Sequence, residues 1–165
     1  KNTLVATDAH GNVHLFQYLP RVADGKEGDR VLRTSASFQM GCAVRAMGRF
    51  EKTTRGKRFG GVFMGGRDGS FLALHALTDS KFRILNTLCS HLAQKLPFAG
   101  GCNPFAKRCP AHFNGHYRKN IEDGELLNLF LFLSLPLQAA IAERIQIPLR
   151  QLVKHVEEAT GTEPF

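Results

Sequence analysis

The first part of the chain alternates apolar and polar residues over short runs, which are separated by turns rich in glycine and aspartate. This pattern predicts β-strands, and we expect them over residues 3–8, 13–19, 30–38, 42–50, 59–65 and 70–77. In the run 13–19 apolar side chains fall on both faces, with Val13, Leu15 and Leu19 on one and Phe16 and Tyr18 on the other. Both faces could therefore be covered, as they are in a β-sandwich or a propeller blade.

An internal repeat supports propeller blades. Residues 5–8 and 11–15 line up with residues 63–66 and 69–73 at an offset of 58 residues, and each copy reads as a strand, a glycine turn and a strand. A blade has four strands, and this offset is close to the span of one blade with a long loop. The alternative is two unrelated hairpins, because glycine turns recur in any β protein. Blades that do not close a ring leave open edges and apolar faces, so we expect the isolated chain to self-associate or to require the rest of its protein.

From Thr78 onward the apolar positions follow steps of three and four, which is the period of a helix. In the first helix these positions are Phe82, Leu85, Leu88, Cys89, Leu92 and Leu96. Residues 78–80 supply candidate caps and Pro97 ends the helix. Further helices are expected to begin near Ser134 and at Pro148. The pattern thus predicts an α+β fold, in which residues 1–77 are the terminal part of a β-propeller and residues 78–165 form a small C-terminal helical domain.

Composition agrees with a folded chain, since 43% of the 165 residues are hydrophobic and 22% are charged, close to globular averages. No apolar run reaches the roughly 18 residues of a membrane span, so we expect no membrane partner. The four cysteines follow no secreted disulfide framework, which favours reduced thiols in cytosol or nucleus. The start at Lys1, without a methionine, indicates a fragment of a longer protein.

A marked helix start follows Asn120. Asp123 is predicted as the capping residue, because its carboxylate can accept hydrogen bonds from the first-turn amides, and Glu125 adds negative charge where the helix dipole is positive. From Leu126 to Leu135 only two residues are polar. We therefore expect a helix without a solvated face, buried by other elements or by a partner.

The net charge of +8 is concentrated in one stretch. Within residues 45–67, Glu51 is the single acid among Arg45, Arg49, Lys52, Arg55, Lys57, Arg58 and Arg67. Such a cluster could neutralise RNA phosphates, an interaction that weakens steeply with salt, or it could be a solvated loop that faces an acidic partner or nothing. It lacks the interleaved aromatic residues of a base-stacking surface, since only Phe50, Phe59 and Phe63 lie there.

No catalytic set emerges from the sequence, so we predict no enzyme and no cofactor. The Gly60-Gly61 and Gly65-Gly66 pairs are not followed by the Lys-Ser/Thr of a phosphate loop. One constellation imitates a zinc site, with the spacing C-x6-C-x2-H-x3-H: Cys102, Cys109, His112 and His116. Structural zinc sites usually pair cysteines two to four residues apart, so we predict no metal here.

Residues 120–126, Asn-Ile-Glu-Asp-Gly-Glu-Leu, are similar to a block near the C-terminus of the large propeller proteins of the CPSF A family. Three groups share the block: the large subunit of the cleavage and polyadenylation specificity factor, the large damaged-DNA-binding protein of cullin ubiquitin ligases, and a subunit of the spliceosomal branch-site complex. Further matches follow the order of the polyadenylation member: Leu4–Asp8, Asn12-Val13, Tyr18–Pro20, Leu32-Arg33, Phe38, Gly41, Leu96-Pro97, Ala99-Gly100, Asn103-Pro104 and Glu125–Asn128. The resemblance spans nearly the whole chain.

The chain departs from the family pattern at three places. Gly101-Cys102 stands where the family usually has one apolar residue, and Lys154 and His155 stand where acidic residues are common. The basic residues 52–58 have no family counterpart. These departures leave the contacts of those three segments open.

The resemblance implies a non-catalytic scaffold in the nuclear machinery that cleaves and polyadenylates pre-mRNA. It implies protein partners, a zinc-finger subunit and a WD-repeat subunit, which recognise the polyadenylation signal and make most of the RNA contacts. It implies no metal in the Cys/His loop, and it marks Asn120, Asp123, Gly124, Glu125 and Leu126 as a structural motif. The alternatives are a direct RNA-binding module that uses residues 45–67, a zinc-dependent module, or a sister-family scaffold of a ubiquitin ligase or the spliceosome.

Overall fold

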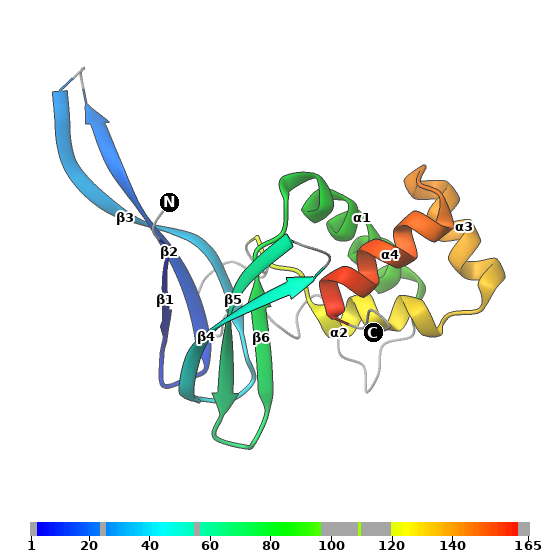
Figure 1. Ribbon diagram of the computed structural model, residues 1–165, viewed down its shortest axis with the longest axis horizontal. Coiled ribbons are helices and arrows are strands. Elements are labelled where there is room, and N and C mark those ends of the chain that lie inside the picture. Colours follow the sequence, from blue (N-terminus) through cyan, green and yellow to red (C-terminus); the bar gives the residue numbers. More distant parts are fainter. Residues whose placement is uncertain (1–2, 24–25, 55–56, 97–108, 110–119, 162–165) are drawn as a thin grey trace. The chain divides into compact units, whose positions relative to one another are not determined.

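The computed structural model describes residues 3–23, 26–54, 57–96, 109 and 120–161 (Figure 1). The strands are β1 (Thr3–Thr7), β2 (Asn12–Ala23), β3 (Lys26–Gln39), β4 (Val44–Thr54), β5 (Lys57–Gly66) and β6 (Phe71–His75). The helices are α1 (Asp79–Lys95), α2 (Gly124–Asn128), the 3-10 helix η2 (Leu129–Phe132), α3 (Leu135–Ile145) and α4 (Leu149–Thr160). Strands are followed by helices, so the predicted α+β class is confirmed.

The chain forms two compact units. The strand unit contains residues 1–76 and 105–121, and the helical unit contains residues 77–104 and 122–165. Asn120 and Ile121 therefore belong with the strands, although they directly precede α2 in the chain.

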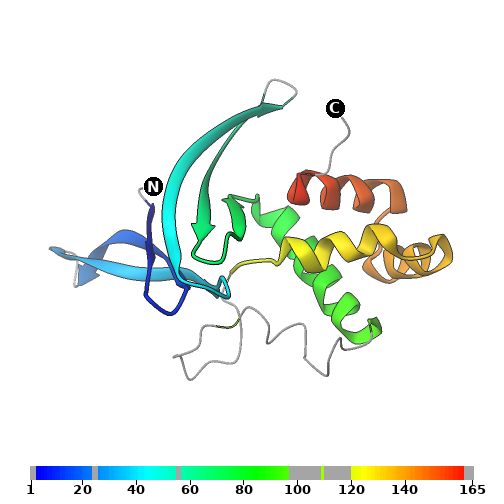
Figure 2. The ribbon, with the colours of Figure 1, turned by 90° about the horizontal axis from the view of Figure 1, so that it is seen from below.

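The strand unit contains two antiparallel sheets, in the orders β1-β2-β3 and β4-β5-β6. Several strands are longer than expected, because β2 and β3 remain paired as far as Ala23 and Lys26, well beyond β1. Pro20 does not end β2, since the register shifts next to it, and a bulge accommodates a residue that lacks an amide hydrogen. The curved strands β4 and β5 likewise extend past β6, which pairs only with residues 61–65 (Figure 2).

The internal repeat is confirmed by strand register. Strand β1 pairs with β2 from Thr3↔Gln17 to Thr7↔Val13, and β5 pairs with β6 from Gly61↔His75 to Gly65↔Phe71. Every pair in one hairpin lies 58 residues from its counterpart in the other.

The two turns of this repeat also share their backbone hydrogen bonds. The Gly11 amide donates to the Asp8 carbonyl at 3.2 Å, and the Gly69 amide donates to the Gly66 carbonyl at the same distance. The Asp8 amide donates to the Asn12 carbonyl, and that of Gly66 donates to the Ser70 carbonyl. The two hairpins therefore match in both register and turn.

The core of the strand unit lies between the two sheets. Its buried residues are Val13, Phe38, Met40 and Met64, with Val5, Leu15, Val62, Leu72 and Leu74 partly buried against them. Side chains alternate across a strand, so Val5, Val13 and Leu15 share one face of the first sheet. Val62, Met64, Leu72 and Leu74 similarly share one face of the second sheet.

The helical unit has its own core. The fully buried side chains come from α1, α2, η2, α3 and α4, and the largest are Leu85, Leu88, Leu92, Leu127, Phe130, Ile141, Leu152 and Val156. None of the helices in the described part of the chain is long and apolar enough to cross a membrane.

The helix predicted to begin near Ser134 is confirmed, since Ser134 is the N-cap of α3. The apolar stretch before it, however, is not one α-helix. The α-helix ends at Asn128, a 3-10 turn continues to Phe132, and a new helix begins at Leu135. Pro136 explains the break, because its ring would collide with the carbonyl of the residue four positions earlier, Phe132. Other elements of the described chain do not cover the whole stretch, since Phe132 is 79% exposed and Leu129 is 45% exposed, and its burial by a partner stays a prediction.

Gln138 holds this break in place. Its side chain is 6% exposed, and its Nε2 donates to the carbonyls of Phe130 at 3.0 Å, Leu131 at 3.3 Å and Leu133 at 3.0 Å. The carbonyls at the end of a helix have no partners within the helix itself. One buried amide on α3 therefore donates to carbonyls at the end of η2, where the Phe130 carbonyl also accepts from the Leu133 amide at 3.3 Å.

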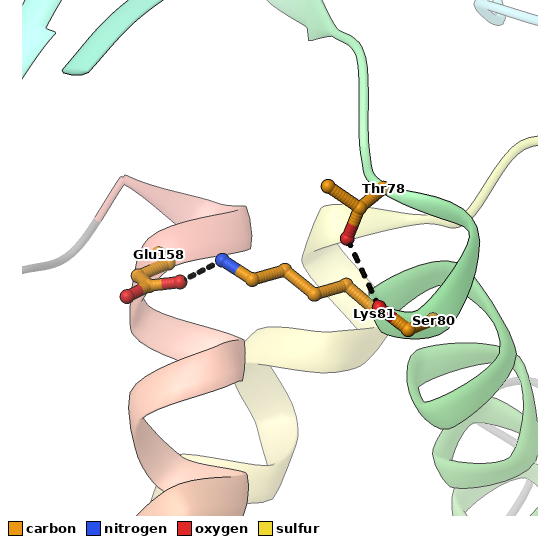
Figure 3. Close-up of polar contacts among 4 residues, drawn as sticks. All are labelled: Thr78, Ser80, Lys81 and Glu158. Carbon is orange, nitrogen blue, oxygen red and sulfur yellow. Dashed lines mark hydrogen bonds and ion pairs between the residues drawn. The ribbon is translucent and has the colours of Figure 1, made fainter.

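An ion pair joins α1 to α4, between Lys81 Nζ and a Glu158 carboxylate oxygen (Figure 3). Near the start of α1 the Thr78 and Ser80 hydroxyl oxygens lie 3.3 Å apart, and Thr78, at the N-cap position, makes no side-chain capping bond. The hydrogen bond from Lys81 lowers the pKa of Glu158. Burial, and then the positive charge of Lys81, lower the pKa of His155.

These shifts predict that mild acid destabilises the helical unit. A group whose pKa is lowered in the folded state binds protons more readily when the chain is unfolded. The free energy of unfolding therefore falls as the pH drops below the pKa of that group in the unfolded chain. This pKa is 6.5 for His155 and 4.5 for Glu158. We expect the melting temperature to fall between pH 7.5 and pH 5.5, and His155→Gln to reduce that fall. Calorimetry at both pH values measures the fall in melting temperature. An equal fall in the variant would show that protonation of His155 is not its cause.

Candidate functional site

Asn120 anchors its segment to the first sheet. Its backbone is left-handed, with φ 52°, a conformation that asparagine tolerates better than most residues. Its Nδ2 donates to the carbonyl of Ser35 at 2.8 Å. Strand β3 bulges at Ser35, because Leu15 pairs with Ala36 while Phe16 pairs with Thr34. The bulge leaves this carbonyl outside the regular ladder, where Asn120 can reach it.

Ile121 strengthens the same anchor by packing against the core of the strand unit. The Ser35 hydroxyl in turn donates to the Leu15 carbonyl at 2.9 Å, which fixes the bulge from its other side. The first two residues of the predicted motif therefore tie the chain to the sheet.

The rest of the motif begins a helix, as predicted. Asp123 is the N-cap of α2, and its Oδ1 accepts from the Glu125 amide at 3.0 Å. Leu126 and Leu127 are buried in the core of the helical unit. A Cβ at Gly124 would meet nothing within 4 Å, and nothing in the structure explains the glycine.

Removal of the cap should have a measurable effect. We expect Asp123→Ala to lower the free energy of unfolding by about 1 kcal/mol, the usual cost of losing a capping side chain. The matched control is Asp79→Ala in the first turn of α1, where the aspartate forms only an exposed pair with Arg83 at 3.0 Å and little loss is expected. Urea titration compares the two, and equal losses would show that Asp123 does not act as a cap.

The predicted basic residues lie on the long β4–β5 hairpin. Arg45 and Arg49 are exposed on β4, and in the described part of the chain neither forms an ion pair. The backbones of Lys52, Lys57 and Arg58 lie in the two strands, with Thr53 paired to Arg58 and Thr54 to Lys57. The side chains of these three, and all of Arg55, lie outside the described residues.

A row of phenylalanine rings crosses the second sheet, and only part of it falls in residues 45–67. Phe50 stacks on Phe63 with ring centroids 6.4 Å apart, and Phe63 stacks on Phe71 at 5.6 Å. Gly61 and Gly48 leave room for the row, since a Cβ at either would lie 2.5 Å from a Phe50 or Phe63 ring atom. The place of Phe71 in this row could be predicted only from the repeat, because Phe71 lies on β6, outside residues 45–67.

The family follows from comparison with known proteins. Residues 1–131 match the family described as the CPSF A subunit region. The chain belongs to the CPSF A subunit family.

Curated relatives of this CPSF A subunit region carry similar names. The chain is 30% identical to cleavage and polyadenylation specificity factor subunit 1 of Arabidopsis thaliana, over 97% of the chain and 12% of that protein. It is 28% identical to the probable subunit 1 of Oryza sativa subsp. japonica, over 94% of the chain and 11% of that protein. It is 26% identical to protein cft1 of Schizosaccharomyces pombe, over 93% of the chain and 11% of that protein. The chain thus spans about a ninth of the length of these relatives.

No metal centre is found among the residues that the structure describes, where no group of three or more His, Cys, Asp and Glu side chains could hold an ion. Of the four residues that imitate a zinc site, Cys109 is half-buried, while Cys102, His112 and His116 lie outside the described ranges. The zinc alternative for the CPSF A subunit region therefore stays a prediction on sequence spacing.

A polar cluster closes the turn between β5 and β6. Asp68 Oδ1 accepts from Cys42 Sγ at 3.0 Å and from the Ser70 amide at 3.0 Å. Hydrogen bonds from Cys42 and Ser70 hold the pKa of Asp68 well below its usual range. The carboxylate thus stays charged and acts as an acceptor for the turn, which is a structural role.

Proposed function

We propose that this CPSF A subunit region is a non-catalytic scaffold in the nuclear machinery that cleaves and polyadenylates pre-mRNA. The observation that carries the proposal is the family match over residues 1–131, together with relatives named as cleavage and polyadenylation specificity factor subunit 1. The motif from Asn120 to Leu126 supports a structural role, because its side chains cap a helix and anchor a sheet.

The proposed partners are a zinc-finger subunit and a WD-repeat subunit of the same machinery, and RNA reaches the scaffold through them. The proposed organisation is a propeller portion over residues 1–77 and a helical domain over residues 78–165, from which Asn120 and Ile121 reach back to the strand unit. The separate cores of the two units support this division, since each part has its own buried apolar residues.

Affinity capture tests the scaffold proposal. A tagged full-length protein expressed in its own cells should recover zinc-finger and WD-repeat subunits of the polyadenylation machinery from nuclear extract, and the untagged protein should recover neither. Recovery of cullin-ligase or branch-site components instead would contradict the proposal and favour a sister family.

Direct RNA binding through residues 45–67 is the second candidate. The observation that favours it is the pair of exposed arginines on β4, Arg45 and Arg49, without ion-pair partners in the described ranges. Charge without base stacking gives mainly non-specific affinity that weakens steeply with salt.

The two candidates predict different results for one triple variant, Arg55→Ala with Lys57→Ala and Arg58→Ala. Under the scaffold proposal we expect the assembled complex to bind a polyadenylation-signal RNA within about twofold of wild type at 150 mM salt, because base-specific contacts lie elsewhere. Fluorescence anisotropy measures the affinity. The control removes three exposed charges from the helical unit: Arg144→Ala, Arg150→Ala and Lys154→Ala. A loss of specific binding confined to the first variant would favour the RNA-binding module.

A further inference from the structure

We draw no further inference here: the strongest candidate, the row of stacked phenylalanine rings on the second sheet that ends in the exposed ring of Phe71, lies in a chain that spans about a ninth of the length of its relatives, and nothing in the structure shows what covers it.

Discussion

Gly11→Ala should be among the most damaging single substitutions in the strand unit. A Cβ at this position would lie 2.2 Å from the carbonyl oxygen of Cys42 and 2.7 Å from its carbon, both of them backbone atoms that cannot rotate away. Gly11 also has a φ of 81°, in the left-handed region, which costs an L-residue about 1–2 kcal/mol by itself. With the collision added, we expect a loss of about 3 kcal/mol or more in the free energy of unfolding.

The repeat supplies the control for this prediction. Gly69 occupies the equivalent turn with a φ of 85°, but a Cβ there would meet nothing within 4 Å. Gly69→Ala should therefore cost only the conformational term of about 1–2 kcal/mol. Urea titration of both variants measures the difference, which isolates the collision with Cys42. Equal losses of unfolding free energy in the two variants would mean that the Cys42 backbone shifts away from the new Cβ without cost.

Gln138→Glu should have the largest effect in the helical unit. The wild-type amide donates to three carbonyl oxygens from a buried position. The substitution places a carboxylate against the same oxygens, and a buried charge facing acceptors costs about 3–5 kcal/mol. We expect the variant to be partly unfolded at pH 7.

Acid should partly rescue this variant. Burial and the facing carbonyls raise the pKa of the new carboxyl, and its protonated form regains one donor, so the deficit relative to wild type should shrink between pH 7 and pH 5. The matched control is Gln151→Glu, the same change at an exposed position of α4, with an expected effect within about 0.5 kcal/mol. Thermal melts at both pH values measure the two variants, and a deficit that grows on acidification would contradict the proposed contacts.

The order of strands and helices, the repeat and the Asp123 cap could be predicted because each rests on local signals. Alternating apolar residues marked the strands, glycine with aspartate marked the turns, and an acid before an apolar run marked the helix start. The family block could be predicted as structural for the same reason, since Asp123 needs only its own first turn as a partner.

The remainder depends on contacts between distant residues. The start of a new helix near Ser134 is a local signal and could be predicted, but Gln138 looks like an ordinary polar helix residue until η2 folds against it. Asn120 finds its acceptor 85 residues away, at a bulge that alternation alone does not locate. The phenylalanine row likewise exists only after three strands pair, because Phe71 is distant from Phe50 in the chain.

The shared register of the two hairpins bears on how this region has diverged. The paired side chains differ at every position, yet five strand pairs and two turn hydrogen bonds keep one constant offset. A substitution leaves an offset intact, whereas one inserted or deleted residue moves all later pairs. If the two hairpins descend from one ancestor, neither has gained or lost a residue relative to the other between its first and last pair. Changes in length are then confined to the segments between the two hairpins, such as the stretch from β2 to β4. There the paired strands can become longer without moving the core residues.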